Sequence, residues 1–291
     1  MTANILGFSA DYKVKAGDHT WTVRERTMDD YLTALQAMDA VPVEDRPRWH
    51  NSTQEDYRNW HCTPDAATFI QMLRTGWIES VDHVEGLDGL SVNRTEQRAF
   101  VHACGGAFAS VPRHLAGHPE AMLNLVRTPS DSIHGLTLIL HGSFGARVNG
   151  DTCLEYARAV MRGLAWLQAE QIETAVYLVR PIELDSLSVA YVCPVRQSGQ
   201  ITDPERIGVC LHPSMLRRAG FAMLEHEYTM ADLPGTHKAT GSQGSPLDMP
   251  LDLLRQILPE TYAIVSLPKV GDGDPQKAIQ EAVNLKLRLE E

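Results

Sequence analysis

The chain has 291 residues, of which 43% are hydrophobic and 22% are charged. This composition is typical of globular proteins and excludes collagen-like, low-complexity and wholly disordered chains. No apolar run approaches the roughly 18 residues that a membrane-spanning helix needs, and the first residues lack a basic region followed by an apolar one. We therefore expect a soluble, intracellular protein with no membrane segment and no secretory signal.

The charge balance is acidic, with 37 Asp and Glu against 26 Lys and Arg, a net charge of −11. Such a surface is repelled by phosphate backbones, so nucleic-acid binding would require a segregated basic patch. The five cysteines contain no CxxC pair and form no recognisable disulfide framework. Reduced, mostly buried thiols are expected, as in a cytoplasmic protein.

The first hundred residues are expected to be mainly helical. Apolar side chains recur three and four positions apart over residues 28–38, which predicts a helix, and Thr27 suits its N-cap. A second helix is predicted over residues 65–75. Gly76 follows it directly, as expected for a glycine that ends a helix.

The clearest pattern lies in the middle of the chain. Residues 136–141 form a short apolar run typical of a buried strand, and residues 174–179 form another. Between them, apolar residues at helical spacing predict a helix that extends to about Glu170 and is capped by Asp151 or Thr152. A strand, a helix and a strand in this order predict two parallel strands.

The rest of the chain continues the alternation of strands and helices. A loop of small polar residues is expected over 235–246. The other predicted elements are strands over 187–193, 207–211 and 262–267, and helices over 213–227, 250–257 and 275 to the C-terminus. Residues 202–205 are expected to start a short helix, because Pro204 would occupy its first position.

Together these elements predict the α/β fold class. The expected organisation is a helix-rich N-terminal part over residues 1–130, followed by a Rossmann-like or von Willebrand A-like core over residues 131–291.

One candidate site is the loop after the strand over residues 136–141, because α/β proteins bind ligands where strands end. Its sequence HGSFG departs from the GxSxG nucleophile elbow, lacks the Lys-Ser/Thr of a phosphate loop, and lacks the first carboxylate of a von Willebrand A metal site. A structural turn is the preferred interpretation. His141, Ser143 and Arg147 stay candidate ligand-binding or partner-binding residues.

A second candidate is the pair Arg217 and Arg218, with His212 nearby. The guanidinium groups could bind a phosphate or a carboxylate. The alternative, which we favour, is that they lie over their own helix or pair with acidic neighbours. The scattered His and Cys residues lack the spacing of a zinc site, so neither a metal nor a cofactor is expected.

Five segments resemble a family of uncharacterised proteins of tailed bacteriophages and related mobile elements, and their order and spacing cover roughly residues 45–230. The resemblance implies an origin in a phage and a location in the host bacterial cytoplasm or the virion. It implies no activity and no catalytic residues. The segments are RWHNST (48–53), residues 69–77 ending in RTGW, VPRHLAGHPEAM (111–122), the strand and helix that hold Arg162 and Gly163, and HPSMLRRAGF (212–221) followed by Glu225.

The leading hypothesis is a non-enzymatic phage protein that acts by protein–protein interaction, as a virion component, an assembly factor or a host-takeover factor. Self-association is a further form of this hypothesis. One alternative is an enzyme that uses His141, Ser143 and a further group, His212 or Glu225. Another is a nucleic-acid-handling accessory factor for replication or packaging. Its basic face would need five arginines: Arg94, Arg98, Arg113, Arg217 and Arg218.

Overall fold

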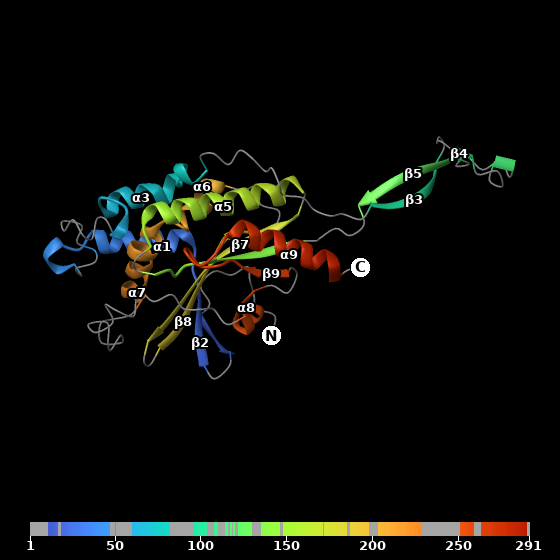
Figure 1. Ribbon diagram of the computed structural model, residues 1–291. Coiled ribbons are helices and arrows are strands. Elements are labelled where there is room, and N and C mark those ends of the chain that lie inside the picture. Colours follow the sequence, from blue (N-terminus) through green and yellow to red (C-terminus); the bar gives the residue numbers. More distant parts are fainter. Residues whose placement is uncertain are drawn as a thin grey trace. The chain divides into compact units, whose positions relative to one another are not determined.

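The computed structural model divides the chain into two compact units. The first consists of residues 1–90 and 134–282, and the second of residues 91–133 and 283–291 (Figure 1). The residues that the structure describes are 11–16, 19–46, 50, 60–81, 96–103, 108–109, 114–115, 117, 119, 122–129, 135–145, 148–170, 172–184, 187–197, 203–227, 251–258 and 263–289.

A six-stranded mixed sheet organises the first unit, in the order β1-β2-β8-β7-β6-β9. β6 pairs in parallel with β7 and with β9, whereas β7 and β8 form an antiparallel pair and β2 runs parallel to β8. The strands are β1 (Asp11–Ala16), β2 (His19–Glu25), β6 (Leu136–His141), β7 (Thr174–Leu184), β8 (Leu187–Arg196) and β9 (Ala263–Ser266).

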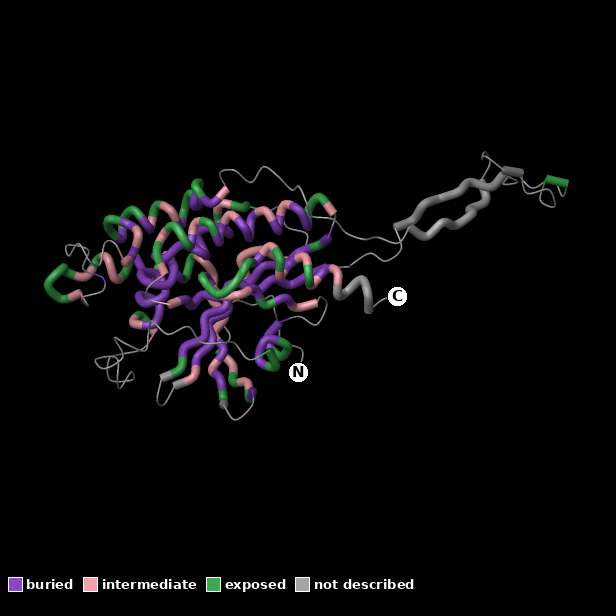
Figure 2. The backbone as a smooth tube through the Cα atoms, viewed as in Figure 1, coloured by how far each residue is buried: buried purple, intermediate pink, exposed green. Residues whose placement is uncertain are grey.

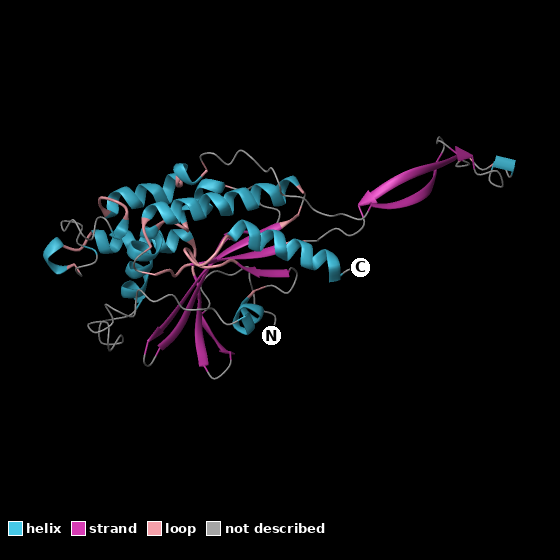
Figure 3. Ribbon diagram, in the orientation of Figure 1, coloured by secondary structure: helices cyan, strands magenta, loops and turns pink. Residues whose placement is uncertain are grey.

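Helices cover the sheet of the first unit (Figure 3). They are α1 (Met28–Asp39), α3 (Ala66–Thr75), α5 (Gly150–Ala169), α6 (Pro204–Val209), α7 (Phe221–Glu227) and α8 (Leu251–Ile257), with the short turns η1 (Val43–Asp45) and η3 (Ile78–Ser80) and the π-helix η4 (Met215–Gly220). The helix α9 (Pro275–Leu289) begins in this unit, and its residues from Val283 onward are assigned to the second unit. The second unit holds a three-stranded antiparallel sheet in the order β3 (Glu96–Ala103), β5 (Met122–Pro129), β4 (Phe108–Ala109).

The hydrophobic core lies on both faces of the central strands. On one face, Trp21 and Val23 of β2 and Ile139 of β6 pack with Leu253 and Leu254 of α8. Side chains alternate between faces along a strand, so the neighbours of Ile139 point to the other face. Every residue of β6 is buried, which is why this strand reads as an uninterrupted apolar run (Figure 2).

Helix starts follow the capping residues of the sequence. Thr27 caps α1, as predicted, and the structure adds a reciprocal capping box with Asp30. Gly76 ends α3 with φ +89°, a conformation that favours glycine. The cap of α5 is Asn149 rather than Asp151 or Thr152, because the Asn149 side chain accepts the backbone N–H of Thr152.

The α/β class and the parallel pair of β6 and β7 around α5 are confirmed. The prediction of a strand over residues 207–211 is wrong, because α6 spans Pro204–Val209. Asp203 caps this helix and Pro204 occupies its first turn. Ile207, Val209 and their apolar neighbours are buried all round, so a short apolar run could not distinguish a strand from a helix.

The structure also divides the chain differently from the expected boundary at residues 130 and 131. β1 and β2 form a hairpin that joins the main sheet through β8, so the N-terminal segment belongs to the same unit as the core. The alternation of Tyr12, Val14 and Ala16 with polar residues is a strand signal that the helical expectation overlooked. The predicted loop over 235–246 lies outside the described residues.

Candidate functional site

The first candidate loop begins where β6 ends. The backbone N–H of Gly142 donates to the carbonyl of Val179, 2.7 Å away, which holds the loop against β7. His141 Nε2 lies 2.8 Å from Ser266 Oγ on the neighbouring strand β9. Ser143 is buried, and among the described residues its Oγ has no hydrogen-bond partner. Arg147 lies outside the described residues.

The second candidate lies on η4. The predicted helix over 213–227 is interrupted there by a π-helical turn before α7 begins. Arg217 and Arg218 both lie on this turn and are almost completely buried, with 1% and 0% of their surface exposed. Such wider turns often occur at functional positions, and this one places two consecutive arginines inside the protein.

Arg217 holds three distant segments together. Its guanidinium donates to the carbonyl of Trp60 and to the carbonyls of Gly145 and Val148, at 3.3 and 2.8 Å. The same group stacks over the rings of Trp60 and Phe144. The candidate loop, the segment before α3 and η4 therefore meet at one side chain.

Arg218 fixes the same segment from its other end. Its Nε donates to Thr63 Oγ1 at 2.9 Å and its Nη2 to the Thr63 carbonyl at 3.0 Å. Thr63 Oγ1 also lies 2.8 Å from Ser214 Oγ, which donates to the carbonyl of His61. Burial lowers the pKa of Arg218 to about 10, so the guanidinium keeps its charge at neutral pH.

The two buried histidines of this region are held in the neutral form. His212 is stacked on Phe69 and meets Trp77 edge-on, and its Nδ1 accepts the backbone N–H of Ser214. Burial, with the nearby guanidinium charges, lowers the pKa of His212 to about 3 and that of His61 to about 2. Both imidazoles are therefore unprotonated, and only weakly basic, near neutral pH.

A third buried arginine, Arg180 of β7, was missed in the sequence analysis. Its side chain passes between two glycines: a Cβ on Gly142 would lie 3.0 Å from the Arg180 Cβ, and one on Gly220 would lie 2.2 Å from its Nη1. The guanidinium also lies over the ring of Phe221. Glycines at both positions are required by this close approach.

The aromatic rings and guanidinium groups form one continuous series. Phe144, Arg217, Trp60, Phe221 and Arg180 follow one another, with centroid distances of 5.2, 5.1, 5.9 and 5.3 Å. Rings of this kind attract cations through their negative faces. We call these five residues the arginine stack. Burial lowers the pKa of Arg180 and of Arg217, and the ring faces offset part of this cost.

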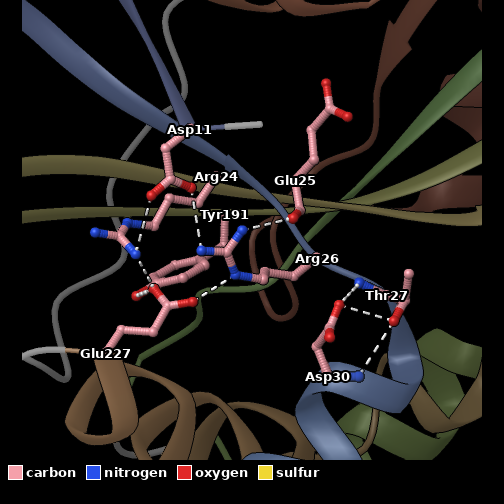
Figure 4. Close-up of polar contacts among 8 residues, drawn as sticks. All are labelled: Asp11, Arg24, Glu25, Arg26, Thr27, Asp30, Tyr191 and Glu227. Atoms are coloured by element: carbon pink, nitrogen blue, oxygen red, sulfur yellow. Dashed lines mark hydrogen bonds and ion pairs between the residues drawn. The ribbon is translucent and has the colours of Figure 1, made fainter. Parts of the chain in front are cut away.

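A separate polar cluster fixes α7 to the sheet (Figure 4). Glu227 accepts hydrogen bonds from Arg24 at 2.8 Å, from Arg26, and from the hydroxyl of Tyr191 at 2.8 Å. Asp11 of β1 pairs with both arginines. Two positive and two negative side chains therefore balance one another in this cluster.

The structure thus brings Arg217 close to the loop that holds Ser143, and places His212 near both arginines. The contacts of Arg217 are backbone carbonyls and aromatic rings, and no described acidic side chain forms an ion pair with Arg218. Sequence reasoning missed the partners in the arginine stack because Trp60 and Phe221 lie 161 positions apart along the chain.

Within the described residues, no group of three or more His, Cys, Asp or Glu side chains is placed so that it could hold a metal ion. No helix in the described part of the chain is long and apolar enough to cross a membrane.

Comparisons with known proteins give one match. Neither a search of curated proteins nor a search of solved structures found a match to this chain. A family model described as a domain of unknown function (DUF7192) matches residues 13–289, which include both units and every described candidate residue. The chain therefore belongs to the DUF7192 family.

Proposed function

We propose that the chain is a phage-encoded, non-enzymatic protein that acts by binding another protein, as a virion component, an assembly factor or a host-takeover factor. The phage origin rests on the sequence resemblance. The observation that carries the mode of action is the burial of the groups capable of chemistry: His141, Ser143 and His212 are only 6, 8 and 4% exposed. Catalytic groups must reach a substrate, whereas these pack into the core.

The distribution of charge supports a protein partner with a basic surface. Three arginines that count toward the net charge of −11 are buried: Arg180, Arg217 and Arg218. Removing their three positive charges from −11 leaves −14 for the rest of the chain. Acidic surfaces attract basic surfaces and accelerate their association.

The nucleic-acid alternative loses two of the five arginines it needs, because Arg217 and Arg218 are buried. The side chains of Arg94, Arg98 and Arg113 lie outside the described part of the structure. A face built from them would also have to overcome the acidity of the surrounding surface.

An acidic stretch near the N-terminus is where we expect the partner to bind. Asp29 on α1 and Glu44 and Asp45 on η1 are exposed, and Val43 between them is 46% exposed. An apolar side chain among acidic ones suits a basic partner surface that offers a small apolar contact.

The first experiment is mass spectrometry of phage particles purified from infected cells and washed in high salt. Recovery of the chain in a fixed ratio to the capsid protein supports the virion form, and its absence refutes that form. For the other forms, the chain is purified from infected cells and its particle mass is measured. A monomer that retains no partner refutes binding altogether.

A matched pair of variants locates the contact. Replacement of Asp29, Glu44 and Asp45 by Lys should release the partner identified in that purification. The control replaces three exposed acidic residues elsewhere, Glu155, Asp272 and Glu281, by Lys and should retain it. Equal loss in both variants would indicate a general charge effect rather than a contact at α1 and η1.

The enzymatic alternative is tested separately. Ser143→Ala and His141→Ala variants that still fold should leave phage yield unchanged if the loop is structural. A loss of yield without a loss of folding would favour the enzyme.

A further inference from the structure

Cys62 lies against the first turn of α5, the helix that also holds Cys153. A Cβ on Gly150 would lie 3.1 Å from the Cys62 Sγ and 3.4 Å from its Cβ, so the segment before α3 is in direct contact with α5 here. The backbone N–H of Gly150 also donates to the Cys62 sulfur. Cys153 lies three residues further along the helix and is 0% exposed.

Helix geometry directs the Cys153 side chain toward the same place. In an α-helix the Cα–Cβ bonds are inclined toward the N-terminus, so Cys153 covers the preceding turn, where Gly150 lies. Side chains three positions apart have Cβ atoms about 5–6 Å apart. Because the Cys62 Cβ lies 3.4 Å from the Cβ position of Gly150, a Cβ separation of about 3.5–4.5 Å between the two cysteines, as a disulfide requires, is within reach.

Arg217 is the common neighbour of the two thiols. Its guanidinium donates to the carbonyl of Trp60, which lies 4.0 Å from the Cys62 Sγ, and to the carbonyl of Val148, which precedes the cap of α5. Burial raises the pKa of both thiols, that of Cys153 to about 12, and the charge of Arg217 opposes the rise in each. The Cys62 thiol adds to the rise at Cys153, as expected of two neighbouring groups.

The backbone of Cys62 is strained. Its φ is +59°, and no other residue except glycine has a positive φ in the described part of the chain. Strained residues persist only where their surroundings fix them, and they are frequent at switches. Hydrogen bonds to the carbonyls of Trp60, His61 and Thr63 fix the segment on both sides of Cys62. The strained conformation thus keeps the Cys62 side chain against α5.

We propose that Cys62 and Cys153 form a disulfide when the chain is exposed to hydrogen peroxide, and that this bond ties the segment before α3 to α5. Cys62 reacts first, because it is half-buried whereas Cys153 is shielded from solvent. This inference does not depend on the proposed function.

The reaction balances with one peroxide for each disulfide. The Cys62 thiolate attacks one oxygen of hydrogen peroxide, which leaves a sulfenic acid, and the departing hydroxide takes up the thiol proton to form water. The Cys153 thiolate then attacks the Cys62 sulfur and displaces a second hydroxide, which takes up the Cys153 proton. Two thiols are oxidised to one disulfide, and one peroxide is reduced to two waters.

A second pair of cysteines provides an internal control. Cys193 and Cys210 are 0 and 2% exposed. Burial raises the pKa of Cys193 well above its usual value, and the neighbouring Cys210 adds to this rise. Peroxide should not reach this pair, because neither thiol contacts solvent. The fifth cysteine, Cys104, lies outside the described residues.

The test uses the full, reduced chain and hydrogen peroxide. After treatment at pH 8, catalase removes the excess peroxide, the remaining thiols are alkylated in denaturant, and peptides are mapped by mass spectrometry without reductant. A disulfide between Cys62 and Cys153 should form, whereas Cys193 and Cys210 should be recovered alkylated. The oxidised chain should have a Tm about 4–8 °C higher, because the bond closes a loop of about 90 residues, and dithiothreitol should reverse the shift.

Two variants separate this pair from general oxidation. Cys153→Ala should leave Cys62 as a sulfenic or sulfinic acid, with no disulfide and no rise in Tm. The matched control Cys193→Ala should form the disulfide as the wild type does. If Cys153→Ala does not fold, Cys62→Ala decides instead: Cys153 should then be recovered alkylated after peroxide treatment.

Three results of the mapping would overturn the proposal: oxidation of Cys62 without a bond to Cys153, a disulfide from Cys62 to another cysteine, or no oxidation of Cys62. A disulfide that lowers the Tm or leaves it unchanged would also overturn it, since the native structure would then not hold the two thiols at bonding distance. All of these outcomes leave the particle and partner experiments unaffected.

Discussion

The packing of α6 against η3 gives the sharpest test of the structure, through the substitution Gly208→Ala. A Cβ on Gly208 would lie 2.0 Å from Ser80 Oγ and 2.7 Å from Ser80 Cβ. Ser80 is fully buried, and its hydroxyl donates to the carbonyl of Trp77 at 2.6 Å. The clash therefore cannot be relieved by turning the hydroxyl toward solvent.

The magnitude follows from that geometry. The separation of 2.7 Å between the two Cβ atoms falls 0.7 Å short of the 3.4 Å at which ordinary contact begins, so one backbone segment must move. Overpacking of this kind typically costs about 1–3 kcal/mol. Alanine recovers up to about 1 kcal/mol over glycine within a helix. The approach of 2.0 Å to Ser80 Oγ places the cost in the upper half of that range, at about 2–3 kcal/mol. We therefore expect a net loss of about 1–2 kcal/mol in the free energy of unfolding.

The assay is urea unfolding followed by circular dichroism, with a double-mutant cycle. Ser80→Gly removes the clashing atoms, so Gly208→Ala should cost nothing in that background. Gly145→Ala is the matched control, because the nearest atom to its Cβ would be Val148 Cγ2 at 3.9 Å. A Gly208→Ala protein as stable as the wild type, or a cycle without coupling, would refute the packing of η3 on α6.

Three further predictions address other contacts. In Gly150→Cys the new Cβ would lie 3.4 Å from the Cβ of Cys62, close to the separation found in disulfides, so oxidation should join the two residues. Peptide mapping without reductant detects this disulfide, and its absence would contradict the geometry. Glu227→Gln should lower the free energy of unfolding by about 1–3 kcal/mol, because Arg24 and Arg26 lose a charged acceptor. If the loss is no larger than that caused by the exposed control Glu281→Gln, the ion pairs of Glu227 do not stabilise the fold. Because the pKa values of His61 and His212 are lowered to about 2 and about 3, the unfolded chain binds protons below about pH 6.5 that the folded chain does not. Stability should therefore fall as the pH drops from 7 to 5, by at most about 1.4 kcal/mol per pH unit for each histidine, and His212→Gln should reduce the slope measured by urea unfolding.

The sequence predicted local structure correctly where a capping residue or an uninterrupted apolar run was present. Thr27 marked the start of α1 and Gly76 marked the end of α3, because capping residues act within a few positions. The apolar run of β6 predicted a buried strand because both of its faces are covered. The prediction of a strand over residues 207–211 was wrong because these residues are buried on all sides, so their sequence shows no periodicity. Asp203 and Pro204, which begin α6, were the more informative residues.

The candidate site was less predictable. The two consecutive arginines, with His212 nearby, were recognised as a candidate site. The favoured interpretation, however, was that Arg217 and Arg218 lie over their own helix or pair with acidic neighbours. The structure instead places both arginines in the core against Trp60, Thr63 and backbone carbonyls. Nothing near η4 in the sequence points to these partners, and Arg180 stood in an apolar strand with no motif around it.

The sequence by itself determined the α/β class, the parallel pair around α5 and most helix boundaries, because periodicity and caps act over a few residues. Only the tertiary structure decided that the N-terminal hairpin joins the main sheet and that Arg180, Arg217 and Arg218 are buried. Both outcomes depend on contacts between segments far apart in the chain, such as β2 with β8 and Trp60 with Phe221. A charge placed in the core by such contacts looks the same in the sequence as a charge on the surface.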